Sequence, residues 1–223
     1  MKKQSILLFG GSGKMGKELQ TLIKEHAFFS LYKSPDSSLT DVDPQQVDLV
    51  IDFSHQKSFS NIAKWAENNR KAFLSGTTGL TEKDFNLLKS ISLSIPVFWS
   101  ANMSVGVYLL NLCLNIISKK TQGLEFKYAI EETHHVDKKD SPSGTALSLL
   151  RVLNDNNIEA KVCSNRQGKE LGVHTVNLVS DEESLLLKHK AHSRRVFAKG
   201  AIRAAEFLVC QPSGLYTMEN LFS

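Results

Sequence analysis

Apolar runs and amphipathic stretches alternate through the first hundred residues. Short apolar runs occupy 6–9, 47–53, 72–74 and 97–99, and helical patterns occupy 14–25, 58–69 and 81–90. This alternation is typical of βαβ units, in which helices join parallel strands. The run at 47–53 is almost continuously apolar, as expected for a strand covered on both faces. The pattern predicts an α/β N-terminal domain with a parallel sheet over residues 1–103.

The pattern changes after residue 104. A helical stretch at 105–118 leads to a strand candidate at 124–131, a histidine-rich loop and a second helix at 145–153. Three further strand candidates follow in succession at 160–163, 173–179 and 183–190. Consecutive strands without intervening helices predict a mixed or antiparallel sheet, and hence a C-terminal α+β domain over residues 104–195. A helix at 200–209 and an apolar tail at 214–222 complete the pattern.

Two apolar groupings are expected in the cores of these domains. Phe59 and Trp65 share one predicted helix, and Leu109, Leu112 and Ile116 form a stripe at helical spacing on another. Stripes of this kind usually face a protein core.

Composition narrows the class of protein. A hydrophobic content of 41% and a net charge of +4 are ordinary for a soluble enzyme. Cys113, Cys163 and Cys210 are widely spaced and odd in number, which predicts reduced cytoplasmic thiols rather than disulfides or a cysteine zinc site. The opening apolar run is too short for a secretory signal. The stretch at 105–117 is interrupted by asparagines and is shorter than the roughly 20 apolar residues that a membrane span needs.

Basic residues crowd one C-terminal stretch, which suggests an anionic partner. Its members are Lys188, Lys190, Arg194, Arg195, Lys199 and Arg203, together with His189 and His192. A solvated basic face and a site that attracts carboxylates both fit this pattern. Nucleic acid fits it less well, and we expect none as a partner.

A glycine-rich loop follows the first predicted strand directly. Gly11, Gly13 and Gly16 satisfy Gly-x-Gly-x-x-Gly, and the spacing that begins at Gly10 satisfies Gly-x-x-Gly-x-x-Gly. Glycines at these spacings permit a tight turn and let backbone N–H groups at a helix start approach phosphate oxygens. The position between strand and helix favours a Rossmann-like dinucleotide site over a ligand-free turn. A Walker phosphate loop is excluded because its Gly-Lys-Ser/Thr ending is missing.

Other strand ends extend this predicted site. The polar turns at 76–79 and 100–104 lie where an open parallel sheet presents its ligand crevice, although each could simply cap a helix. The second strand, 29–32, ends in Lys33, where NAD-binding units usually carry an acidic residue for the ribose hydroxyls. A lysine there favours the 2′-phosphate of NADPH, while the nearby Asp36 complicates the choice between NADPH and NADH.

The densest chemistry lies in the segment 131–147. His134, His135, Lys138 and Lys139 precede Ser-Pro-Ser-Gly-Thr, which opens a predicted helix. A helix start exposes N–H groups suited to a carboxylate, a histidine transfers protons near neutral pH, and a lysine supplies positive charge. The combination predicts an anionic substrate that must also be protonated, with Asp140 orienting the loop. Adjacent histidines on an extended backbone point to opposite sides, so we expect no metal site.

These motifs together resemble those of the dihydrodipicolinate reductase family, also called 4-hydroxy-tetrahydrodipicolinate reductases. The resemblance runs from end to end: GGSGKMG at 10–16, IDFS at 51–54, GTTG at 76–79, ANMSVGV at 101–107, HHVDKKDSPSGTA at 134–146, AHSRRVFAKGA at 191–201 and GLYTM at 214–218. It implies a Rossmann-like N-terminal domain and a C-terminal α+β domain that binds substrate and forms a homotetramer. It also implies that the tail, about 196–223, packs back on the first domain.

The resemblance further implies an activity and a set of site residues. The activity is NAD(P)H-dependent reduction of a small cyclic dicarboxylate in the cytoplasmic synthesis of lysine and diaminopimelate. His134 matches the general acid/base and Lys138 the catalytic lysine, while His135, Gly144 and Thr145 match substrate contacts. The cofactor positions correspond to Gly10, Gly11, Ser12, Gly13, Lys14, Met15, Gly76, Thr77, Thr78, Ser100, Ala101, Asn102 and Met103, with Lys33 where many members carry the acidic ribose contact.

Two departures and two rival hypotheses accompany this expectation. The chain is shortened between its second strand and Val47, and Lys33 puts a preference for NADH in doubt. One rival is a dehydrogenase acting on aspartate semialdehyde or homoserine, which would not require the histidine segment. The other is a sensor that binds NADPH without oxidising it.

Overall fold

The computed structural model describes residues 3–222, and the chain divides into two compact units. Unit 1 comprises Met1–Met103 and Arg194–Ser223, and unit 2 comprises Ser104–Ser193. Residues 1–2 and 223, at the ends of the predicted N-terminal domain and tail, lie outside the described residues. Within the part that is described, no helix is long and apolar enough to cross a membrane.

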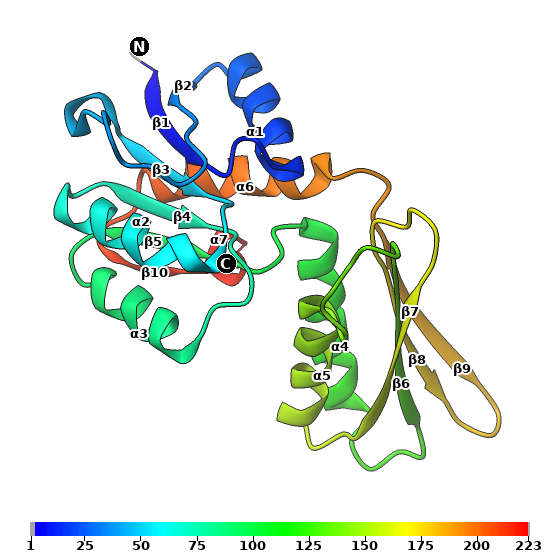
Figure 1. Ribbon diagram of the computed structural model, residues 1–223. Coiled ribbons are helices and arrows are strands. Elements are labelled where there is room, and N and C mark those ends of the chain that lie inside the picture. Colours follow the sequence, from blue (N-terminus) through cyan, green and yellow to red (C-terminus); the bar gives the residue numbers. More distant parts are fainter. Residues whose placement is uncertain (1–2, 223) are drawn as a thin grey trace. The chain divides into compact units, whose positions relative to one another are not determined.

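Unit 1 is built on a six-stranded parallel sheet with the strand order β10-β5-β4-β3-β1-β2 (Figure 1). Its strands are β1 (Gln4–Phe9), β2 (Phe29–Lys33), β3 (Leu49–Asp52), β4 (Ala72–Ser75), β5 (Pro96–Trp99) and β10 (Gly214–Tyr216). Its helices are α1 (Lys14–Glu25), α2 (Gln56–Asn68), α3 (Glu82–Ile91), α6 (Arg195–Leu208) and α7 (Met218–Leu221), with a short 3-10 turn at Pro44–Gln46. The predicted parallel α/β architecture is confirmed.

Helices cover both faces of this sheet, which explains its nearly continuous apolar strands. All four residues of β3 are buried, because α1 and α6 pack together on one face while α2 and α3 cover the other (Figure 1). Phe59 on α2 is fully buried, and Trp65 packs at the edge of the same core. The glycine loop follows β1 at the carboxyl end of this covered sheet.

Helix α6 begins at Arg195, five residues before the predicted start at residue 200. Small residues such as Ala198, Ala201 and Ala205 face the core of unit 1 and allow close packing. At Gly200 an added Cβ would lie 1.6 Å from the carbonyl oxygen of Met103, so only glycine lets the helix approach this backbone. The tail then adds β10 to the edge of the sheet beside β5.

Unit 2 contains a four-stranded mixed sheet with the order β7-β6-β8-β9 (Figure 1). The strands are β6 (Lys127–His134), β7 (Ala160–Arg166), β8 (Val173–Val179) and β9 (Ser184–Lys190), and the helices are α4 (Val105–Lys120) and α5 (Gly144–Asp155). Strands β6 and β7 are parallel, whereas the β6–β8 and β8–β9 pairs are antiparallel. The predicted α+β domain with a mixed sheet is confirmed.

Two details of unit 2 differ from the sequence-based expectation. Strand β6 runs to His134 rather than ending at residue 131, and Glu132 and His134 continue its alternation of buried side chains. Because both residues are polar, the hydropathy pattern predicted a loop here. The prediction that Leu109, Leu112 and Ile116 lie in the core is wrong, because these side chains are 49%, 40% and 53% exposed. Helix α4 is apolar on several faces, and its core face is instead formed by residues such as Leu110 and Leu114.

Candidate functional site

The glycine loop of unit 1 has the geometry of a phosphate cradle. Gly10 adopts a φ of +78°, and a Cβ there would lie 2.3 Å from the carbonyl oxygen of Phe53. A Cβ at Gly16 would lie 2.2 Å from the carbonyl oxygen of Gly10, so glycine is required at both positions. Helix α1 begins at Lys14 without a side-chain cap or an acidic residue in its first turn. Such a helix start is suited to an anion, and these residues fit the pyrophosphate of a dinucleotide.

The other predicted cofactor turns lie at the same edge of the sheet, because β1, β3, β4 and β5 are parallel and end together. A buried carboxylate, Asp52 at the end of β3, holds one of these turns. It accepts hydrogen bonds from Thr77 Oγ1 at 2.8 Å, from Ser75 Oγ at 3.0 Å and from Ser54 Oγ at 2.6 Å. Asp52 therefore fixes the turn at 76–79, a role that sequence reasoning missed although the residue stands in the IDFS motif.

The turn after β5 is held by its own polar atoms. Ser100 Oγ donates to the carbonyl oxygen of Asn102 at 2.8 Å, and the Asn102 N–H donates to Ser100 Oγ at 3.3 Å. Met103 is buried in unit 1. The turn is therefore a compact element at the ligand edge of the sheet, beside the turn at 76–79.

Two opposite charges lie where the adenosine ribose of a dinucleotide would be expected. The Lys33 ammonium donates a short hydrogen bond to the carbonyl oxygen of Asp41. Asp36 Oδ1 accepts a hydrogen bond of 3.2 Å from the Ser12 N–H of the glycine loop. Hydrogen bonding by Ser12 lowers the pKa of Asp36, so this carboxylate carries its negative charge at the loop. The case for NADPH that rests on Lys33 alone is weakened by this placement.

The predicted histidine pair divides between two environments in unit 2. His134 is the last residue of β6 and is 6% exposed, whereas His135 begins the following loop and is half-buried. Burial lowers the pKa of His134 to about 4, even though Glu132 acts in the opposite direction. His134 is therefore neutral at pH 7 in the ligand-free protein.

Three residues that sequence reasoning missed surround His134. Glu132 is fully buried, and its Oε2 lies 3.4 Å from His134 Nδ1. His174, on β8, lies with its ring centroid 5.0 Å from that of His134, and Arg166, at the end of β7, lies 3.5 Å from Glu132 Oε1. We call Glu132, His134, His174 and Arg166 the Glu132 cluster. Glu132 lies two positions before His134 on the same face of β6. Strand pairing alone brings Arg166 and His174 beside them, so no local motif could have revealed those two residues.

The predicted lysine and the predicted carboxylate receptor lie in the loop that joins β6 to α5. Lys138 Nζ binds both oxygens of Asp140, at 2.7 and 2.8 Å. Arg166 holds this loop by donating from Nε to the carbonyl oxygen of Lys138 at 3.2 Å. Asp140 therefore pairs with Lys138, the lysine for which the sequence predicts a catalytic role.

Helix α5 begins at Gly144, and its N-cap residue is the buried Ser143, whose Oγ accepts the Ala146 N–H at 3.2 Å. The first-turn N–H groups of a helix have no partner within the helix and favour an anion. A Cβ at Gly144 would meet nothing within 4 Å, so there is room for a ligand at this helix start. Thr145, the next predicted contact, is buried.

A metal ion is not required by this arrangement. Potential ligand atoms of Glu132, His134 and His174 lie within 4.8 Å of one another, a grouping that the sequence did not predict. However, the guanidinium of Arg166 and the Ser143 N–H, 2.9 Å from Oε1, already compensate the negative charge of Glu132. We therefore assign no metal to this cluster.

The buried histidines make the stability of unit 2 depend on pH. Burial lowers the pKa of His174 to about 3, below the ordinary value of 6.5. Folding thus favours the neutral rings, and this stability is fully present above pH 6.5 and is lost as pH falls toward the folded pKa values. We expect the titration of His174 alone to lower the unfolding free energy of unit 2 by about 2 kcal/mol between pH 7.5 and pH 5. Both tryptophans, Trp65 and Trp99, lie in unit 1, so their fluorescence does not report on unit 2. Amide hydrogen exchange of β6 and β8 at the two pH values measures the change instead.

The matched variant is His174→Gln, which removes the titrating ring from the same position. The pH-dependent loss of protection in β6 and β8 should shrink by about half, since His134 still titrates. Equal pH dependence in the two proteins would show that His174 is not the responsible group.

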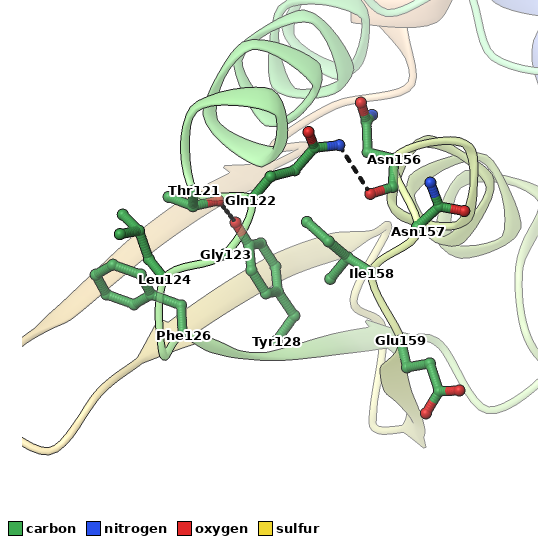
Figure 2. Close-up of a pocket in the computed structure, with 10 residues that line it drawn as sticks. All are labelled: Thr121, Gln122, Gly123, Leu124, Phe126, Tyr128, Asn156, Asn157, Ile158 and Glu159. Carbon is green, nitrogen blue, oxygen red and sulfur yellow. Dashed lines mark hydrogen bonds between the residues drawn. The ribbon is translucent and has the colours of Figure 1, made fainter.

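A cavity of about 490 Å³ lies at the other end of α5, away from the histidines (Figure 2). The ends of α4 and α5 and the start of β6 line it with Thr121, Gln122, Gly123, Leu124, Phe126, Tyr128, Asn156, Asn157, Ile158 and Glu159. Gln122 Nε2 donates to the carbonyl oxygen of Asn156 at 3.1 Å across its rim, as Figure 2 shows. Its side chains offer neither a histidine nor a cation, so we assign it no part in the chemistry predicted for the segment 131–147.

The basic stretch is distributed over both units. Lys188 and Lys190 lie on β9 of unit 2, and the arginines lie at the start of α6 and along it in unit 1. Lys190 pairs with Glu170 at 3.3 Å, and Arg195 pairs with Glu25 at 3.2 Å. These ion pairs favour the interpretation of the basic stretch as a partly neutralised surface rather than as a single anion-binding site.

Comparison with known proteins identifies relatives over nearly the whole chain. Family models described as the N-terminus and the C-terminus of dihydrodipicolinate reductase match residues 4–103 and 106–222. A 4-hydroxy-tetrahydrodipicolinate reductase of Bdellovibrio bacteriovorus is 39% identical over 99% of this chain and 97% of its own length. That of Caldanaerobacter subterraneus subsp. tengcongensis is 33% identical over 97% of both chains.

A solved structure has the same fold. It is the dipicolinate-bound dihydrodipicolinate reductase of Paenisporosarcina sp. TG-14, with a TM-score of 0.78, 16% identity, and coverage of 98% of this chain and 99% of that one. At 16% identity this likeness shows the fold alone. The family models and the full-length relatives match the sequence itself. The chain therefore belongs to the dihydrodipicolinate reductase family.

Proposed function

We propose that this chain is an NAD(P)H-dependent reductase that converts 4-hydroxy-tetrahydrodipicolinate to tetrahydrodipicolinate in the synthesis of lysine and diaminopimelate. The substrate gains a hydride and a proton, and its 4-hydroxyl group leaves as water. The observation that carries the proposal is the grouping of a buried histidine, a lysine and a helix-start carboxylate receptor around one loop. This grouping occurs in a chain whose full-length relatives are named for that reaction. It suits an anionic substrate that must be protonated.

The substrate carboxylates would be held by Lys138 and by the start of α5. Lys138 Nζ would exchange Asp140 for a substrate carboxylate, which is possible because the lysine is only partly buried. A second carboxylate would accept hydrogen bonds at Gly144 and Thr145, where the helix dipole stabilises negative charge. His135, half-buried at the start of the same loop, would contribute a further contact.

His134 would supply the proton. Its pKa of about 4 in the ligand-free protein makes it a poor proton carrier at pH 7. An anionic substrate beside the ring favours the charged form and raises this pKa, so the histidine gains its proton when the substrate binds. When bound at the glycine loop of unit 1, the nicotinamide cofactor supplies the hydride. Asp52, by fixing the turn at 76–79, would keep the cofactor edge of the sheet in place.

For the cofactor, we propose that Lys33 and Asp36 together allow the use of both NADPH and NADH. Lys33 attracts a 2′-phosphate, whereas the Asp36 carboxylate repels it and suits ribose hydroxyls. Two opposite charges near the same ribose leave a small net preference between the two cofactors.

Two substitutions should move the cofactor preference in opposite directions. Asp36→Asn removes the repulsion and should raise the ratio of kcat/KM for NADPH to that for NADH by about 10-fold, as expected for loss of one nearby charge at the protein surface. Lys33→Glu reverses a charge, a change of two, and should lower the same ratio by at least that factor. Steady-state kinetics with each cofactor measures both ratios. Lys17→Glu, at an exposed position of α1, is the control for a change of net charge. A similar shift in that variant would show that Lys33 and Asp36 do not set the cofactor preference.

The test of the proposed function follows nicotinamide absorbance in a coupled assay with the preceding synthase. Oxidation of the cofactor that depends on the synthase product supports the reductase. Cofactor binding without oxidation favours the sensor, and oxidation with aspartate semialdehyde or homoserine as partner substrate favours the rival dehydrogenases.

We also propose that the enzyme acts in the cytoplasm as a homotetramer that assembles through unit 2. The sheet face opposite α4 and α5 carries exposed apolar side chains, among them Leu186 at 56% and Val179 at 45% exposure. Sedimentation equilibrium tests this assembly, and a monomer at micromolar concentration would contradict it.

A further inference from the structure

The Glu132 cluster contains two buried atoms that face each other without a hydrogen bond. Glu132 Oε2 and His134 Nδ1 lie 3.4 Å apart, and within the described residues neither has a hydrogen-bond partner. Buried polar atoms are rarely left unsatisfied, because the loss of hydration is costly. A proton on His134 Nδ1 that turns toward Oε2 would satisfy both atoms.

The second oxygen of the same carboxylate serves the start of α5. Glu132 Oε1 accepts the Ser143 N–H at 2.9 Å, and Ser143 is the N-cap of that helix. One side chain thus contacts both the ring that would supply the proton and the helix start that would hold a substrate carboxylate. Its neighbour Glu131, on the same strand, is exposed and takes no part in this contact.

We propose that Glu132 is a positioning residue that holds His134 in the tautomer with its proton on Nδ1 and fixes the helix start at Ser143. This tautomer leaves Nε2 as the atom that exchanges a proton with the substrate, as a carboxylate does for the histidine of a catalytic triad. The role requires an ionised carboxylate in the interior. Although burial acts to raise the pKa of Glu132, the hydrogen bonds from Ser143 are chief among the effects that outweigh it, and that pKa is lowered.

The charges around His134 are consistent with this role. The charged or titratable groups that act on its ring are Glu132 on β6, Lys138 and Asp140 in the following loop, Arg166 on β7 and His174 on β8. Of these, the two carboxylates favour the protonated ring and the cations disfavour it. Asp140 is bound to Lys138, so Glu132 is the carboxylate that faces the ring directly.

Substitution by glutamine tests the tautomer directly. In Glu132→Gln the amide oxygen can still accept the Ser143 N–H, which turns the amide NH₂ toward His134 Nδ1. An N–H donor there requires a lone pair on Nδ1 and should therefore move the proton to Nε2. Nitrogen-15 NMR of labelled histidine reports the tautomer, and the spectrum of His134→Gln identifies the His134 signals among the seven histidines.

The kinetic result should separate positioning from a merely structural role. We expect kcat of Glu132→Gln to fall by about 10-fold or more, up to the roughly 100- to 10,000-fold that general acid–base catalysis contributes. KM should change little, because the helix start keeps its hydrogen bond. Glu131→Gln is the matched control and should keep the wild-type tautomer and kcat, and Glu132→Asp should restore part of the kcat.

The inference rests on the proposed function for its kinetic part, and the experiment distinguishes their failures. An inactive wild-type protein with the proton of His134 on Nδ1 would overturn the proposed reaction but support the role of Glu132. A wild-type ring with its proton on Nε2, or an active Glu132→Gln with unchanged tautomer and kcat, would overturn the inference. Stoichiometric metal in the purified protein, lost in Glu132→Gln, would also overturn it, since the carboxylate would then be a ligand.

Discussion

Replacing His134 with glutamine should lower kcat by about 100- to 10,000-fold, the range that a general acid contributes. Glutamine is polar and of similar size, but it does not carry a proton at neutral pH. KM should remain within a few-fold, because Lys138 and the start of α5 are unchanged. The coupled assay measures kcat, and far-UV circular dichroism verifies that the fold is intact.

The control is His26→Gln in unit 1. His26 Nδ1 accepts the Phe28 and Phe29 N–H groups at the end of α1, so this variant affects local stability without touching the histidine segment. Its kcat should equal that of the wild type. A His134→Gln protein with near-normal turnover and an intact fold would exclude His134 as the proton donor.

Replacing Gly10 with alanine should unfold the glycine loop and abolish cofactor binding. The new Cβ would lie 2.3 Å from a backbone oxygen, and the φ of +78° is itself unfavourable for alanine. We expect unit 1 to lose roughly 3 kcal/mol of unfolding free energy, from overpacking and backbone strain together. Urea unfolding followed by tryptophan fluorescence measures the loss in unit 1, and calorimetric titration measures cofactor affinity.

Gly79→Ala separates the two causes. Gly79 has a similar φ of +72°, but a Cβ there meets nothing within 4 Å. This variant should lose only about 1 kcal/mol, the cost of the left-handed backbone. Equal losses in the two variants would show that the close approach of Gly10 to Phe53 has no energetic importance.

The local features of the cofactor site could be predicted from the sequence because each depends on neighbouring residues. Gly10, Gly13 and Gly16 lie within seven consecutive residues at the start of α1, and the strand and helix there have clear periodicities. The parallel sheet followed from the same alternation, since helices between strands make the strands parallel. The choice at Lys33 could not be predicted, because it depends on Asp36, which reaches the glycine loop only in the folded chain.

The histidine segment was predicted in its residues but not in its surroundings. The pattern placed His134 in a loop, whereas it ends β6 and is buried. A polar residue within a strand gives the same hydropathy signal as a loop residue. The apolar stripe on α4 shows the converse error, because a helix that is apolar on several faces does not reveal which face the sheet covers.

The sequence by itself determined the order of the elements, the glycine cradle, the helix start at Ser143 and the presence of a histidine and a lysine beside it. These depend on residues a few positions apart, whose relative geometry follows from local backbone preferences. The tertiary structure alone decided that Arg166 and His174 lie beside Glu132 and His134, because β7 and β8 reach β6 only through long-range strand pairing. It also decided the ionisation of the site, since burial and neighbouring charge, rather than residue type, set the pKa of His134.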